Sequence, residues 1–119
     1  MTPSTNHPRS RLPHHQLVAY RVALELLVAV KAAGIRDAKL ADQAMRAAKS
    51  ACLNAAEAAG RVSRADKARV LGIARGEAAE AVAAVEIAEL SGDAAIGSAD
   101  RCIPIAERLN ALLTGFIRC

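Results

Sequence analysis

The sequence has almost no aromatic side chains: its 119 residues include one Tyr, one Phe and no Trp. Two aromatic rings argue against the stacking platforms on which sequence-tolerant proteins bind single-stranded nucleic acids. Large apolar side chains are also scarce, because twenty-nine alanines supply much of the 53% hydrophobic content. A core of such small side chains is thin, so we expect burial between subunits, and hence an oligomer, to supplement it.

Long uncharged runs are also lacking. No stretch of about 18 residues is free of charge, and the N-terminal segment has no apolar run that would act as a signal peptide. We therefore expect no membrane span and no secretion signal. The three cysteines, Cys52, Cys102 and Cys119, form an odd set without a CxxC pair, which is typical of a reducing compartment. The sequence predicts a cytoplasmic protein.

Catalytic and metal-binding patterns are missing. A di-metal centre in a helical bundle needs inward Glu residues and Glu-x-x-His pairs, but His7, His14 and His15 all precede or open the first expected helix. The cysteines have no neighbouring base that would activate them as nucleophiles, and there is no glycine-rich phosphate loop. We expect no enzymatic activity, no metal and no other cofactor.

Helical periodicity dominates the rest of the chain. Residues 1–13 contain three prolines and only Leu12 to bury, which predicts a disordered tail. Residues 14–119 predict one helical domain, in which apolar residues recur at three- and four-residue spacing. The four expected helices span residues 16–33, 37–59, 63–91 and 100–118. The apolar face expected for the first comprises Leu17, Tyr20, Leu24, Leu27, Val28 and Val30.

Several residues mark the helix ends. Gly34 supplies a stop for the first helix and Asp37 a cap for the second. Ser63 with Asp66 three residues later resembles a capping box that opens the third. Pro104 is tolerable only in or near the first turn of the fourth. Short connections make successive helices antiparallel, so the sequence predicts an all-α, up-down-up-down four-helix bundle.

Two segments carry a family resemblance. The stretch RAAKSACLNAAE at residues 46–57, followed by IARGEAAE at 73–80, resembles the four-helix bundle family of the 23S rRNA intervening-sequence proteins, whose relatives include accessory proteins of diversity-generating retroelements. Ala58 replaces the Gly that usually follows the first motif, and Glu77 replaces the usual Ser of the second. The resemblance implies a ring-like homopentamer in a family that includes nucleic-acid-binding members.

A line of polar residues follows one face of the second expected helix. Its members are spaced by four, four and three residues: Arg46, Ser50, Asn54 and Glu57. In a hairpin of the second and third helices, Arg46 lies level with Glu77 and less than a turn from Glu80, which predicts an interhelical ion pair. The six residues form a structural polar network in our first interpretation. A solvated face and a ligand-binding or catalytic role are the alternatives.

The charge distribution is uneven. Sixteen basic and twelve acidic residues give a net charge of +4. The expected topology gathers the following bases at one end of the bundle: Arg9, Arg11, Arg61, Arg64, Lys67, Arg69 and Arg118. The third helix instead finishes with Glu86, Glu89 and Asp93. The basic end forms a rim for phosphate backbones, pairs with acidic ends of other subunits, or simply solubilises the helix ends.

These observations lead to two functional hypotheses. The first is a non-enzymatic homo-oligomer, a pentamer by resemblance, that binds structured RNA, DNA or a ribonucleoprotein with little sequence preference. The residues expected to contact nucleic acid are Arg61, Arg64, Lys67, Arg69 and Arg118. The alternative is a structural or protein-binding adaptor ring that makes its contacts through an alanine-rich helix face.

Overall fold

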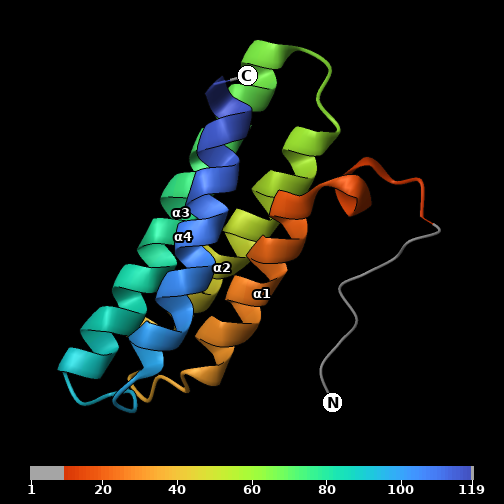
Figure 1. Ribbon diagram of the computed structural model, residues 1–119. Coiled ribbons are helices and arrows are strands. Elements are labelled where there is room, and N and C mark those ends of the chain that lie inside the picture. Colours follow the sequence, from red (N-terminus) through yellow and green to blue (C-terminus); the bar gives the residue numbers. More distant parts are fainter. Residues whose placement is uncertain (1–9, 119) are drawn as a thin grey trace.

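The computed structural model describes residues 10–118, and within this range every regular element is helical (Figure 1). A short 3-10 helix, η1 (Pro13–Gln16), precedes four α-helices. They are α1 (Val18–Ala32), α2 (Ala38–Ala59), α3 (Arg64–Leu90) and α4 (Ser98–Arg118). The predicted all-α class with four helices is therefore confirmed.

Successive helices run in opposite directions (Figure 1). Each helix packs against its two neighbours, the α2–α3 pair is the most extensive, and α1 meets α4 to close the bundle. One end contains the starts of α1 and α3 and the ends of α2 and α4. We call this the basic end and the opposite end, with the α1–α2 and α3–α4 connections, the distal end.

Alanine forms much of the core. The buried face of α2 consists of Cys52 and six alanines: Ala44, Ala47, Ala48, Ala51, Ala55 and Ala58. Alanine side chains allow helix backbones to approach closely and lose no rotamer freedom on burial. Large side chains with almost no exposure are few, and Leu26, Leu109 and Leu113 are the largest. Much of the stability of this bundle therefore rests on close helix contact.

The apolar face predicted for α1 is displaced around the helix. The buried residues are Ala19, Val22, Ala23, Leu26 and Val30. Of the predicted face only Val30 is buried, and Val28 is 42% exposed. Because α1 is apolar on nearly every side, Leu17, Leu24 and Leu27 flank the core, whereas Leu26 and two alanines lie within it.

Two predicted caps are confirmed. The Asp37 carboxylate accepts a hydrogen bond from the Leu40 amide at 3.0 Å, and Ser63 Oγ accepts one from the Asp66 amide at 3.1 Å. Gly34 follows α1 with φ of 57°, a conformation that favours glycine. These three helix ends lie where the sequence predicted them, because each depends only on contacts between residues that are neighbours in the sequence.

The fourth helix begins two residues before the predicted start. The Glu89 carboxylate, from the end of α3, accepts a hydrogen bond from the Ala99 amide at 2.9 Å and so supports the earlier start. Pro104 is consequently the seventh residue of α4, beyond its first turn. The expectation that Pro104 lies in or near the first turn was therefore wrong.

The two connections at the distal end are tied together. The Arg36 amide donates to the Asp93 carbonyl at 2.8 Å, and the Arg36 guanidinium donates to the Gly92 carbonyl. These bonds join the α1–α2 and α3–α4 connections, which are far apart in sequence.

No helix within residues 10–118 is long and apolar enough to cross a membrane.

Part of the sequence predictions lies outside the described residues. This applies to His7, Arg9 and Cys119 and to most of the predicted tail, residues 1–9. Pro13, which the sequence assigned to the tail, is the first residue of η1.

Candidate functional site

The basic end brings together the five cations that the sequence selected as nucleic-acid contacts. Arg61 lies in the α2–α3 connection, Arg64, Lys67 and Arg69 lie in the first turns of α3, and Arg118 is the last residue of α4. Among the described residues at this end, the acidic ones are Glu57 and Asp66. The basic end therefore carries a clear excess of positive charge.

Two of these cations are neutralised within the chain. The Arg61 guanidinium binds the Glu57 carboxylate and also lies 3.1 Å from Oδ2 of Asp66. Arg69 donates to Oδ1 of Asp66 from Nη2 at 2.9 Å and from Nε at 3.2 Å. The hydrogen bond from Arg69 is the main cause that lowers the pKa of Asp66, and the bond to Glu57 is the main cause that raises the pKa of Arg61.

The other three cations have no carboxylate partner among residues 10–118. Arg64 and Arg118 are exposed, and Lys67 is half-buried. None of the ion pairs of the described chain involves them. Arg64, Lys67 and Arg118 are therefore available for an external anion.

Antiparallel packing offsets an unfavourable charge order in α3. Bases near the start of a helix and acids near its end oppose the helix dipole, and α3 has Arg64 and Lys67 at its start and Glu86 and Glu89 at its end. The negative ends of α2 and α4, however, lie beside the start of α3. At the distal end, Glu89 binds the positive start of α4. Neighbouring helices thus hold each group of charges in place.

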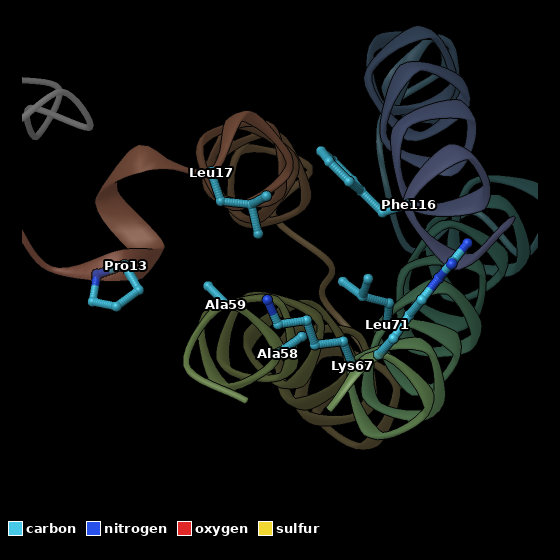
Figure 2. A pocket seen from close by; sticks show the side chains of 8 residues that line it. Pro13, Leu17, Ala58, Ala59, Lys67, Leu71 and Phe116 are labelled. Atoms are coloured by element: carbon cyan, nitrogen blue, oxygen red, sulfur yellow. The ribbon is translucent and has the colours of Figure 1, made fainter. Parts of the chain in front are cut away.

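An open cavity of about 380 Å³ lies beside the free cations (Figure 2). Its apolar lining comes from η1 and the start of α1, the end of α2, and α3 and α4: Pro13, Leu17, Ala58, Ala59, Leu71 and Phe116. Arg64 and Lys67 also line it. Two of its lining residues, Ala58 and Ala59 at the end of α2, have small side chains.

The predicted polar line divides into smaller groups. Asn54 donates to Oγ of Ser50 at 3.1 Å and to its carbonyl oxygen at 2.9 Å. Arg46 lies 3.7 Å from Asp42, one turn earlier on α2, so the ion pair predicted with Glu77 is replaced by a local one. Both side chains of the local pair are largely exposed.

The α2–α3 hairpin nevertheless brings most of the residues of the predicted polar network close together. Arg46, Ser50, Glu77 and Glu80 line the same open surface depression. Glu57 is separate from this group, because it binds Arg61 at the basic end.

Comparison with protein families decides the membership of the chain. Residues 16–115 match the family described as 23S rRNA-intervening sequence protein. The chain belongs to this family. A comparison with curated proteins gave no match. The resemblance seen in the sequence is thus confirmed, and it covers all four helices except the last residues of α4.

In this intervening-sequence family member, Cys52 and Cys102 are free thiols in the core. Burial raises the pKa of the Cys52 thiol to about 11 and also raises the pKa of Cys102. Both therefore stay protonated, and hence weakly nucleophilic, near neutral pH. Among the described residues, no three His, Cys, Asp or Glu side chains come close enough to hold a metal ion.

Thiol reactivity tests this arrangement. In a Cys119→Ser variant at pH 8, we expect Cys52 and Cys102 to react with a disulfide reagent only slowly in the native protein, because roughly one Cys52 in a thousand is ionised. Both should react rapidly in denaturant. The measurement is the absorbance of the released thiolate, and rapid native reaction of either cysteine would contradict the burial described.

Sequence reasoning missed three features of this region. Asp66 was assigned to a capping box, yet its carboxylate binds Arg61 and Arg69 while only its amide serves the cap. Phe116, near the end of α4, is 42% exposed beside the cavity, and no role for it at a site was predicted from the sequence. Arg75 donates to Oγ1 of Thr114 at 3.2 Å and links α3 to α4. Of these three features the sequence signalled only one, through the position of Asp66 between Arg61 and Arg69.

Proposed function

We propose that this family member is a non-enzymatic homo-oligomer that binds structured RNA or DNA through its basic end. The observation that supports this most directly is the group of three cations, Arg64, Lys67 and Arg118, which have no carboxylate partner within residues 10–118. Cations of this kind bind phosphate oxygens and release counterions. The chain's reduced, buried Cys52 and Cys102 suit a cytoplasmic location.

Binding of this kind has little sequence preference. The described basic end has one exposed aromatic ring, Phe116, so the available contacts are charges directed at phosphates. Arg61 and Arg69 already share carboxylates with Glu57 and Asp66 and contribute less. The proposal therefore ranks Arg64, Lys67 and Arg118 above the other two cations named from the sequence.

Exposed apolar side chains support self-association. Leu53 is 70% exposed on α2, Ile73 is 43% exposed and Ile87 54% exposed on α3. Burial of such side chains between subunits would add apolar contact to a core rich in alanine. In a ring of parallel subunits, the basic ends would lie on one face and their charges would act together. We propose a ring-like pentamer on the basis of the family resemblance.

A salt titration tests the nucleic-acid proposal. We expect the triple substitution Arg64→Gln, Lys67→Gln and Arg118→Gln to weaken binding to generic duplex RNA by about tenfold or more at physiological salt. The dependence of log affinity on log salt should become shallower by about 3 per chain, because each lost phosphate contact removes about 0.9. Fluorescence anisotropy measures both quantities, with oligomer mass followed by sedimentation.

The distal end offers a matched control. Lys31, Lys39 and Arg101 are exposed cations there, and their replacement by Gln changes the net charge by the same amount. This control should retain most of the affinity and salt dependence. Equal losses in the two triple variants would show a general charge effect and reject the basic end as the binding surface.

Removal of a single acidic side chain provides the converse test within the same titration. Asp66→Asn removes the only carboxylate partner of Arg69 among residues 10–118 and one of the two partners of Arg61. Both guanidinium groups then become more available to phosphates, so RNA affinity should increase. Asp42→Asn, which frees only Arg46 on the side of the bundle, is its control. Tighter binding by both variants alike would contradict a localised interface.

The second candidate function is a protein-binding adaptor or structural ring. The exposed Leu53 and Ile73 favour it, because apolar side chains on neighbouring helices can bury against a protein partner. Apolar contacts persist in high salt, whereas phosphate contacts weaken. Absence of duplex binding at low salt, with an intact oligomer, would favour the adaptor.

A further inference from the structure

The cavity at the basic end combines apolar walls with a cationic rim. Figure 2 shows Leu17, Leu71 and Phe116 around a common space, with Lys67 beside it. Its volume of about 380 Å³ lies near the lower end of the range for small-molecule sites, roughly 300 to 1,000 Å³. The elements that form the walls come from both ends of the described chain, so the cavity is part of the folded bundle.

The walls favour an apolar ligand body. Leu71 is buried at the base, while Phe116 is 42% exposed although it is the largest apolar side chain of the site. A ligand chain or ring placed here would remove apolar surface of Phe116 and Leu17 from water, which favours binding roughly in proportion to the area covered. The small side chain of Ala59 leaves room for that body.

The rim favours an anionic head group. Arg64 and Lys67 line the cavity and have no carboxylate partner among residues 10–118, whereas their neighbours Arg61 and Arg69 are both paired. Lys67 is half-buried against apolar side chains, where an anion would form charge-assisted hydrogen bonds with its ammonium group. Arg64 also begins α3, whose positive end attracts negative charge.

We propose that this cavity is a binding site for a small amphipathic anion. The aliphatic or aromatic body of the ligand lies between Leu17, Leu71 and Phe116, and its carboxylate binds Arg64 and Lys67. This site does not depend on the proposed nucleic-acid binding, although both use the same two cations. An occupied site would neutralise those cations and oppose phosphate binding.

The probe for this proposal is decanoate, a ten-carbon monocarboxylate, titrated into the full chain without nucleic acid. Decanol has a similar apolar chain without the charge, and acetate has the charge without the chain. We expect decanoate to bind about tenfold or more tightly than decanol, because a charge-assisted hydrogen bond contributes enough for that ratio. Acetate should not bind measurably. Amide chemical-shift changes at residues 58–71 and around residue 116 locate the site.

Four variants separate the contribution of the anionic head group from that of the apolar body. Arg64→Gln with Lys67→Gln should reduce decanoate affinity to that of decanol, whereas Lys31→Gln with Lys39→Gln at the distal end should leave it unchanged. Ala59→Leu fills the cavity and should abolish binding of both probes, and Phe116→Ala, which removes a wall without adding bulk, should weaken both. Circular dichroism confirms that each variant is folded.

Specific results would overturn the proposal. Equal affinity for decanoate and decanol would remove the role of the cations. Full binding by folded Ala59→Leu, or shift changes confined to other helices, would show that the probe binds elsewhere. Because no nucleic acid is present, these outcomes are independent of the RNA titration.

Discussion

Replacement of Leu109 by alanine should lower the free energy of unfolding by about 3 kcal/mol. Leu109 is fully buried and is one of few large side chains in the core. Its truncation removes apolar contacts and leaves a cavity in a core cluster made mostly of alanine and valine, whose small side chains fill such a space poorly. Because small domains are stable by only about 5 to 15 kcal/mol, this is a large fraction of the total.

Urea unfolding followed by circular dichroism measures this loss. Leu53→Ala is the matched control, because the side chain is 70% exposed on α2 and its truncation should change stability by about 0.5 kcal/mol or less. If the oligomer buries Leu53, the difference between the two variants will narrow as protein concentration rises. A Leu109→Ala variant as stable as the unaltered protein at all concentrations would contradict the described core.

Enlargement of Ala48 to leucine should also destabilise the bundle, by about 1 to 3 kcal/mol. Ala48 is 1% exposed on α2, the helix that packs most extensively against α3. The added atoms have no space between closely packed helices, so either the helices separate or the side chain adopts a strained rotamer. Ala48 belongs to the buried core cluster, so a larger side chain there must displace its neighbours.

The control for Ala48→Leu is Ala83→Leu. Ala83 is exposed on α3, and leucine has nearly the helix propensity of alanine, so stability should remain within about 0.5 kcal/mol. Thermal melting of both variants at the same concentration provides the comparison. An Ala48→Leu variant with an unchanged or higher melting temperature would show that the helices do not pack closely at this position.

The sequence predicted most helix ends because they depend on local chemistry. The caps at Asp37 and Ser63 and the stop at Gly34 each involve residues within a few positions. The start of α4 was displaced by two residues because Glu89, from the preceding helix, supports it through the Ala99 amide. A contact between separate helices leaves no local signal for sequence reasoning to use.

The buried face of α1 could not be predicted from residue size. On a helix that is apolar nearly all round, the spacing of leucines does not indicate which side meets the other helices. Ala19 and Ala23 are buried in the core, while the larger Val28 is 42% exposed. Helix proximity, rather than side-chain hydrophobicity, decides burial in this bundle.

The residues that gather at the candidate site were predictable from the sequence, but the ion pairs among them were not. Topology alone placed Arg61, Arg64, Lys67, Arg69 and Arg118 at one end. Which of these are paired depends on where two carboxylates point: Asp66 binds Arg61 and Arg69, and Glu57 also binds Arg61. The predicted Arg46–Glu77 pair failed for a related reason, since a closer acid on the same helix, Asp42, was available.

The packing of α1 against α4 imposes an order on how the molecule can assemble. As the chain is synthesised from its N-terminus, α1 emerges first but lacks one of its two neighbours until the final helix appears. The hydrogen bonds from Arg36 to Gly92 and Asp93 likewise wait for a segment made more than fifty residues later. The nascent α2–α3 hairpin is complete before then, and α1 stays partly uncovered until the last helix closes over it.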